Sequence, residues 1–294
     1  MGEEELRFER LPELDRPVMV CAFRGWNDGG QGASLAGGFL AREWQAERFA
    51  DVDPENFYDF QATRPMVTLV DGETRTIEWP ENAFYFARPR ELGRDAILLL
   101  GVEPNVRWRT FASLIVDFAK DLGVEMVITL GALLADVPHT RPSPVTGSAT
   151  DRKLVEELGL STSRYEGPTG VVGVLHDACN TAEIPSVSLW AAVPHYVQLT
   201  PSPRAAQALC ERLATLLGGH IDVSELRRAG RGYVEQVSEA VAADAETAAY
   251  VEELEQRSDT IDPEEIPSGD ALAAELTRYL RDREEEGGDA ATDQ

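Results

Sequence analysis

Short apolar runs alternate with amphipathic segments through the first 220 residues of the chain. Near-continuous apolar runs of this length are typical of strands that are covered on both faces of a sheet. They occur at Val18–Phe23, Ala96–Val102, Glu125–Leu134 and Ser186–Ala192. Apolar residues at intervals of three and four predict helices, and they occur at Leu35–Trp44, Arg107–Leu122, about residues 173–182 and Pro203–Leu217.

This alternation predicts the fold class. Strands and helices that alternate at such spacing form βαβ units, so we expect an α/β fold with a mostly parallel sheet and helices on both faces. Met66–Val70 and Thr74–Trp79 flank Asp71-Gly72, a pair that favours a β-hairpin. The hairpin would be an antiparallel addition to the sheet. The segment after Leu134 is rich in proline and polar residues and predicts a loop.

The composition changes after His220. Residues 221–294 hold 21 acidic and 7 basic residues, and their apolar positions follow a helical stripe from about residue 222 to 257. That stripe predicts either one long helix or two helices broken near Asp244. A further amphipathic stretch at Leu272–Leu280 predicts another helix. The helices would form an appendage that packs on the α/β body or on a neighbouring chain.

These patterns predict the domain organisation. We expect an α/β domain at residues 1–220 and a C-terminal helical region at residues 221–283. Residues 284–294 are acidic and contain glycine, which predicts a disordered tail. A short helix is also expected within the α/β domain, at Asp151–Leu158.

The net charge of the chain limits which kinds of partner it can bind. The formal net charge of −25 argues against a nucleic-acid binder and against docking on anionic lipid, because both need a basic surface. The start of the chain lacks the apolar stretch of a signal peptide, and no apolar run approaches the roughly 20 residues of a membrane span. Three cysteines in apolar stretches indicate reduced core thiols. We therefore expect a cytoplasmic protein.

Candidate chemistry lies where the predicted strands end. In open α/β sheets, ligands bind outside the carboxyl ends of the strands. The loops there carry polar and aromatic side chains that could line one crevice for a ligand or a partner: Gly25, Trp26, Asn27, Asp28, Glu103, Asn105, Asp136, His139, Arg141, His195 and Tyr196. Carboxylates beside histidines could perform acid–base chemistry, but polar residues at strand ends occur in any α/β protein.

The loop Gly25–Ser34 fails the tests for the common cofactor motifs. It lies before a predicted helix, where free N–H groups could face an anion, but it lacks the lysine of a phosphate-binding loop. Leu35 stands where a dinucleotide fingerprint needs its third glycine, and Ser34 comes too far after the strand for a nucleophile elbow. The four histidines show no metal-ligand spacing. We therefore assign no catalytic residue, cofactor or metal.

Four separated blocks resemble one family. Ala22–Gly30, with its Gly-Trp-Asn-Asp-Gly loop, is similar to the N-terminal signature of the proteasome assembly chaperone family, the "PAC two" group, in its bacterial (actinobacterial) branch. The segments Leu100–Asn105, Leu130–Pro142 and Ser188–Tyr196 fit the same family in the same order. Together the blocks span about residues 17–220, and the helical C-terminal region also resembles the bacterial branch.

The resemblance implies a fold similar to purine nucleoside phosphorylases and related hydrolases. Relatives in eukaryotes and archaea are ATP-independent chaperones that bind proteasome α-subunits, and with no complete catalytic motif in the sequence we expect a non-enzymatic, homo-oligomeric protein. Archaeal members can dock through a C-terminal hydrophobic–Tyr–any motif, which the ending Ala291–Gln294 lacks. The leading hypothesis is thus an assembly-chaperone-like binding protein whose partner is a proteasome subunit or another protein. The alternative is a hydrolase or phosphorylase-like enzyme that uses the strand-end crevice.

Overall fold

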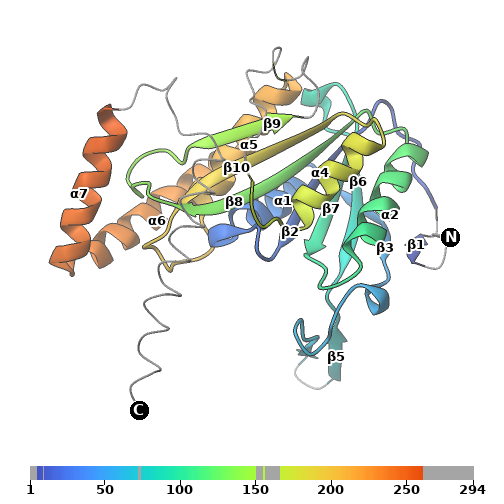
Figure 1. Ribbon diagram of the computed structural model, residues 1–294, viewed down its shortest axis with the longest axis horizontal. Coiled ribbons are helices and arrows are strands. Elements are labelled where there is room, and N and C mark those ends of the chain that lie inside the picture. Colours follow the sequence, from blue (N-terminus) through green and yellow to red (C-terminus); the bar gives the residue numbers. More distant parts are fainter. Residues whose placement is uncertain (1–4, 9, 72–73, 150–154, 156–165, 261–294) are drawn as a thin grey trace.

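A computed structural model describes residues 5–8, 10–71, 74–149, 155 and 166–260 of the chain. Its centre is an eight-stranded sheet with the strand order β1-β3-β6-β7-β2-β8-β10-β9 (Figure 1). The four middle strands, β7, β2, β8 and β10, are parallel, and the strands outside them pair antiparallel. The sheet strands are β1 (Leu6–Phe8), β2 (Val18–Arg24), β3 (Glu47–Val52), β6 (Asn82–Ala87), β7 (Ala96–Val102), β8 (Met126–Ala135), β9 (Val145–Ala149) and β10 (Ser186–Pro194).

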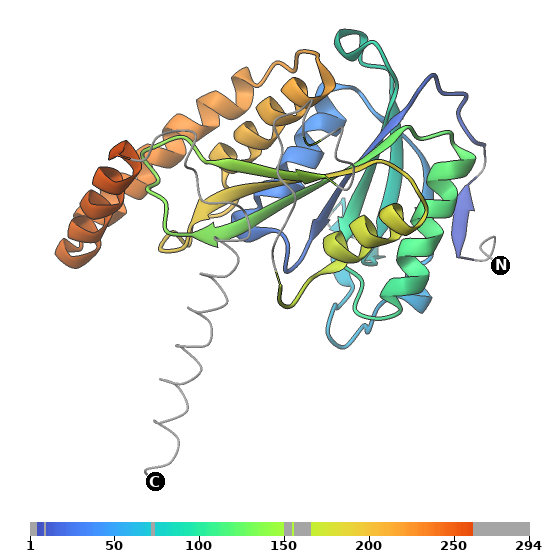
Figure 2. The same cartoon turned by 45° about the horizontal axis from the view of Figure 1, so that its top comes forward.

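Helices cover both faces of this sheet, as Figure 2 shows. One face packs against α1 and α5, and the other packs against α2 and α4. The described helices are α1 (Gly32–Glu43), α2 (Trp108–Asp121), α4 (Val171–Thr181), α5 (Pro203–Leu217), α6 (Ser224–Ala242) and α7 (Ala245–Thr260), with short 3-10 turns at Gly29–Gln31, Pro54–Asn56 and Arg90–Leu92. The expected α/β fold with a mostly parallel central sheet is confirmed.

The central strand β2 explains why its sequence is apolar throughout. Side chains alternate between the faces of a strand. Val18, Val20 and Ala22 join the cluster beneath α1 and α5, whereas Met19, Cys21 and Phe23 join the cluster beneath α2 and α4. All six are buried. Cys21, like the other two cysteines, is a buried free thiol.

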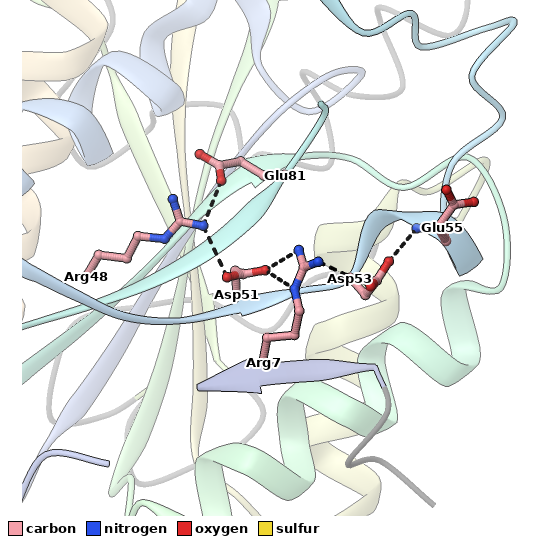
Figure 3. Close-up of polar contacts among 6 residues, drawn as sticks. All are labelled: Arg7, Arg48, Asp51, Asp53, Glu55 and Glu81. Carbon is pink, nitrogen blue, oxygen red and sulfur yellow. Dashed lines mark hydrogen bonds and ion pairs between the residues drawn. The ribbon is translucent and has the colours of Figure 1, made fainter. Parts of the chain in front are cut away.

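Charged side chains fasten the short strand β1 to the sheet edge. Arg7 on β1 contacts Asp51 Oδ1 on β3 at 2.5 Å and Asp53 Oδ2 at 3.2 Å. The other oxygen of Asp51 lies 3.2 Å from Arg48, which in turn lies 3.0 Å from Glu81 (Figure 3). These groups are partly exposed, so we regard the network as a guide to the register of β1 rather than a large source of stability.

Three expectations need correction. The expected helix at Leu35–Trp44 begins earlier, at Gly32, because the carboxylate of Asp28 caps it from within the loop. The expected hairpin forms as β4 (Met66–Val70) and β5 (Thr74–Glu78), but these pair only with each other in a separate two-stranded sheet. The loop predicted after Leu134 contains β9, which pairs with β10 and was missed because its residues, Val-Thr-Gly-Ser-Ala, lack an apolar run.

The C-terminal region forms two helices within the described residues. The break lies at Asp244, whose side chain accepts hydrogen bonds from the N–H groups of Glu246 and Thr247 at the start of α7. The two-helix alternative is therefore correct. The predicted helix at Leu272–Leu280 and the tail at residues 284–294 lie outside the described residues, as does most of Asp151–Leu158. None of the described helices has the length and apolar content to cross a membrane.

Candidate functional site

The topology defines where a ligand crevice would lie. The chain leaves β2 toward α1 on one face of the sheet and leaves β8 toward α4 on the other. Adjacent strands whose connections diverge in this way open a crevice at their carboxyl ends, and ligands of α/β proteins bind there. The loop at residues 25–31 follows β2 directly at this point.

That loop closes the crevice with its own backbone. The N–H of Ala132 on β8 donates to the carbonyl of Asn27 at 2.9 Å, and Asp28 forms a parallel bridge with Ala132. Gly29 lies so close to β8 that a Cβ there would sit 3.0 Å from the Ala132 carbonyl oxygen. The chain thus fills the space between β2 and β8 that a ligand would need.

Asp28 occupies the beginning of α1. Its Oδ1 accepts hydrogen bonds from the N–H groups of Ala33 at 2.9 Å and Ser34 at 3.1 Å. Its Oδ2 is buried and has no hydrogen-bond partner among the described residues. Burial raises the pKa of this carboxyl, although the hydrogen bonds from Ser34 and Ala33 oppose the shift. The carboxylate therefore takes the position that an external anion would take at the helix N-terminus.

Glu103 organises the first group of predicted site residues. Its two carboxylate oxygens accept hydrogen bonds from Trp26 N at 3.0 Å, from Asn27 Nδ2 at 3.1 Å and from Val171 N at 2.8 Å. It thereby joins the loop after β2 to the first turn of α4. Gly25 has a φ of 143° and faces Glu103, where a Cβ would lie 2.8 Å from that of Glu103.

Trp26 and Asn105 flank this group but point elsewhere. The Trp26 side chain is 54% exposed, although its backbone N–H is fixed by Glu103. Asn105 belongs to the segment around residues 57–59: its Oδ1 accepts from Asp59 N at 3.0 Å, and its own N–H donates to the Phe57 carbonyl at 2.9 Å. The loop therefore presents a large aromatic ring on a rigid backbone.

Asp136 and His195 belong to a second group, which follows β8 and β10. His195 Nδ1 lies 3.0 Å from Asp136 Oδ1. The hydroxyl of Tyr250 on α7 donates to the same oxygen at 2.9 Å. The rings of His195, Tyr196 and Tyr250 pack edge to face with centroids 5.7–6.1 Å apart. An aspartate–histidine pair can do acid–base work, but here it is shared with a helix of the C-terminal region.

His139 and Arg141 extend the same contact. His139 Nδ1 lies 2.8 Å from the Tyr196 hydroxyl, and its Nε2 lies 3.0 Å from Ser238 Oγ on α6. Burial lowers the pKa of His139 and raises that of Tyr196 to about 12. Arg141 forms a two-pronged ion pair with Asp259 on α7, with both distances 2.8 Å.

Ten of the eleven predicted residues therefore lie in two settings, and Asn105 belongs to neither. Gly25, Trp26, Asn27, Asp28 and Glu103 lie where the loop after β2 meets β8 and α4. The second setting is a docking contact for α6 and α7, formed by Asp136, His139, Arg141, His195 and Tyr196.

The sequence reasoning missed the partners of the second group on the C-terminal helices. Ser238 and Tyr250 are two of them, and Glu255, which accepts from Thr140, and Asp259 are the others. A signal was present in the sequence. Glu255 and Asp259 follow the buried Val251 at intervals of four, so they continue the packed stripe of α7 as charged residues.

The remaining space near these groups is limited. The cavity between the second group and α6 measures about 10 Å³ and is lined by His139, Arg141 and Tyr233 among others, which leaves room for one water at most. A hollow of about 330 Å³ lies beside α1 over the ends of β2 and β7, with Arg24, Glu81 and Tyr85 in its wall. In the described part of the chain, acidic, histidine and cysteine side chains form no cluster of three that could hold a metal ion.

The family model and the solved structures agree with one another. The model of the PAC2 family matches residues 22–241. A PAC2 family protein from Streptomyces avermitilis is 47% identical with a TM-score of 0.73, and the match covers 80% of this chain and 99% of that one. A proteasome-assembly chaperone homologue from Mycobacterium tuberculosis is 44% identical with the same coverage and TM-score. An archaeal proteasome activator from Pyrococcus furiosus shares the fold at 20% identity, with a TM-score of 0.65 and coverage of 80% and 97%. No curated protein matches the chain.

Proposed function

Because the chain belongs to the PAC2 family, we propose that it is a non-enzymatic, assembly-chaperone-like protein that binds proteasome subunits. The names of the mycobacterial homologue and of the archaeal relatives support a role in which the partner is a protein. We further propose that the chain acts as a homo-oligomer. Three buried free thiols favour a reducing compartment, so we place this activity in the cytoplasm.

The observation that carries this proposal is the closed crevice between β2 and β8. Asn27 pairs with β8, and Asp28 satisfies the first N–H groups of α1. Glu103 does the same for Val171 at the start of α4. In an α/β enzyme, polar groups at this place would face the substrate. Here they form hydrogen bonds that hold the loops, which favours a binding surface over a catalytic one.

Trp26 is the proposed anchor for the partner. Tryptophan is enriched among the residues that contribute most to binding energy at protein interfaces. A residue whose backbone is already held in place loses less conformational entropy when it binds. The hydrogen bond from its N–H to Glu103 fixes the backbone of Trp26, while its indole remains exposed. Val106, 45% exposed, lies on the neighbouring loop after β7 and would extend the apolar contact.

The test is direct binding to purified proteasome α-subunits, by calorimetry, together with the rate at which those subunits assemble. We expect Trp26→Ala to weaken binding by about thirtyfold, the effect of losing roughly 2 kcal/mol at a hot spot. Leu11→Ala is the matched control, because Leu11 is an exposed apolar residue near the β1 edge. If the unmodified protein neither bound α-subunits nor changed their assembly rate, the proposal would fail.

A small-molecule enzyme is the second candidate function. The 3.0 Å contact between His195 and Asp136 and the hollow of about 330 Å³ beside α1 favour it. A screen of nucleosides and amides as hydrolase or phosphorylase substrates tests this candidate. Turnover that disappears in His195→Ala or Asp136→Ala, as well as in Asp28→Ala or His139→Ala, with every variant checked for folding, would support an enzyme. No turnover above background would exclude it for these substrate classes.

A further inference from the structure

The hairpin of β4 and β5 carries an unusual share of the exposed apolar surface. Six of the eleven large apolar residues that are exposed in the described part of the chain lie on the hairpin or at its base: Met66, Val67, Leu69, Val70, Ile77 and Trp79, which are 46–64% exposed. In Figure 1 the hairpin projects away from the eight-stranded sheet. An isolated two-stranded hairpin is only marginally stable in water. Its exposed apolar side chains therefore favour packing against another surface.

The register separates the two faces of the hairpin. Val67 pairs with Ile77 and Leu69 pairs with Arg75, so these side chains share one face, and Trp79 continues it two residues after Ile77. Phe60 packs edge to face against Trp79, with ring centroids 4.8 Å apart, and supports the base of this face.

The opposite face is more polar. Its central pair is Thr68 and Thr76, whose hydroxyls lie 2.9 Å apart, and Thr68 also donates to Glu78 at 3.1 Å. This face also carries Met66 and Val70, but its centre is polar, whereas Val67, Leu69, Ile77 and Trp79 make the other face mainly apolar.

We infer that the apolar face of this hairpin packs against the same face of a second copy of the chain. The inference rests on the homo-oligomer proposed above and assigns its interface. The same patch meets itself in a twofold contact, so the patch must be self-complementary. A face built from Val67, Leu69 and Ile77 meets this condition, because apolar side chains need no matching charge.

Charge favours a second copy at this place. Two chains that each carry −25 repel one another over most of their surfaces. Residues 64–79 are close to neutral, with two arginines against three carboxylates. Arg75 lies opposite Leu69 on the same face, and the long side chain of an arginine can keep its guanidinium in water beside an apolar contact. The hairpin is thus a site where like-charged chains can meet with little repulsion.

The available area sets the strength of this contact. The four apolar side chains of the face, Val67, Leu69, Ile77 and Trp79, are each about half exposed and offer roughly 400 Å² per copy, so two copies would bury on the order of 800 Å², which is the size of a weak interface and not of a permanent one. Such a small interface predicts a reversible association that depends on protein concentration.

Sedimentation of the full chain over a wide concentration range tests the inference. We expect the double variant Leu69→Lys/Ile77→Lys to raise the dissociation constant of self-association at least about tenfold. The double variant Thr68→Lys/Thr76→Lys adds the same charges to the opposite face and should leave the constant within about twofold. Circular dichroism of each variant checks that the body is folded, and because the hairpin pairs with no strand of the main sheet, we expect both to fold.

The possible outcomes are distinct. A monomeric wild type at every concentration would overturn both the interface and the proposed homo-oligomer, and would leave this face to a different protein. An oligomer whose constant is insensitive to the lysines on the Leu69 face, or equally sensitive to those on the Thr68 face, would overturn the interface alone. Binding of proteasome α-subunits, measured on the same variants, is a separate readout: its loss in the wild type would reject the proposed partner and not the hairpin contact.

Discussion

Two groups of polar side chains lie at the carboxyl ends of the parallel strands, and they are held by different parts of the chain. Glu103 and the loop after β2 are held within the α/β body, through Trp26, Asn27 and Val171. Asp136 and His139 are held by the C-terminal helices, through Tyr250 and Ser238. Both groups contain the residue types of an acid–base site, yet in each the polar atoms bind other parts of the same chain.

The difference determines what each group can do. The Glu103 group can be lost only when the body opens, because its partners lie on the loop after β2 and at the first residue of α4. The Asp136 group loses its partners whenever α6 and α7 lift from the strand ends. Local opening costs less free energy than global unfolding, so the second group is the one that a change of conditions can expose.

Replacement of Glu103 by alanine should have the largest effect. It leaves the N–H groups of Trp26 and Val171 and the amide of Asn27 without their carboxylate partner. Hydrogen bonds to a charged group contribute about 1.5–3 kcal/mol each when buried, and this site is partly exposed. We therefore expect the free energy of unfolding, measured with urea, to fall by about 2–4 kcal/mol.

Glu103→Gln is the matched control. It keeps one acceptor oxygen and the same shape, so we expect about half of the loss seen with alanine. If Glu103→Ala changed the free energy of unfolding by less than about 0.5 kcal/mol, as a surface substitution does, the Glu103 group would not hold the loop, and the contrast with the second group would disappear.

The central fold could be predicted from sequence because it depends on local patterns. The apolar run at Val18–Phe23 and the amphipathic repeat at Arg107–Leu122 each identify an element without knowledge of its neighbours. Two strands carry no such pattern: β1 and β9 are short edge strands with the sequences Leu-Arg-Phe and Val-Thr-Gly-Ser-Ala. Their pairing with β3 and β10 is a property of the tertiary structure.

The candidate site was predicted only in part, for the same reason. Asp136 and His195 each follow a predicted strand, and the carboxyl ends of parallel strands lie at the same edge of a sheet. The sequence alone was therefore enough to predict that these two residues lie near each other. Their partner Tyr250 is more than 100 residues from Asp136, and no local rule relates the two. Long-range contacts of this kind decide whether a polar cluster faces a ligand or another helix.

Two tyrosine-to-phenylalanine variants compare the C-terminal helices with the α/β body, because each variant removes one hydroxyl group. Tyr250→Phe removes the hydroxyl that donates to Asp136 at 2.9 Å. Tyr58→Phe removes a hydroxyl within the body, which donates to the Val102 carbonyl at 2.6 Å and accepts from Asn82 at 2.5 Å. Each loss should amount to about 1 kcal/mol.

Hydrogen exchange distinguishes where the loss appears. For Tyr250→Phe we expect amides of α7 to exchange about fivefold faster, the factor for 1 kcal/mol, while those of β2 remain unchanged. For Tyr58→Phe we expect the slow amides of the body to change instead. Equal protection of α7 in both variants would mean that the helix opens only with the whole domain.

The smallest predicted effect is a pH dependence of the α6 contact through His139. Burial lowers the pKa of His139 in the folded protein, and the nearby Arg204 acts in the same direction while Glu255 opposes it. The unfolded value is about 6.5. A lowered folded pKa means that the unfolded or opened state binds the proton more tightly, so the stabilisation is complete above pH about 6.5 and declines as the pH falls toward the folded pKa.

We therefore expect amides of α6 around Ser238, which contacts His139 Nε2 at 3.0 Å, to lose protection below pH about 6.5, after correction for the intrinsic rate of exchange. His139→Gln should remove this dependence. His176→Gln is the control, because burial also lowers the pKa of His176 but this residue contacts Ser186 beneath α4. The control should therefore retain the pH response of α6. If His139→Gln retained it as well, His139 would not be the source of the pH response of α6.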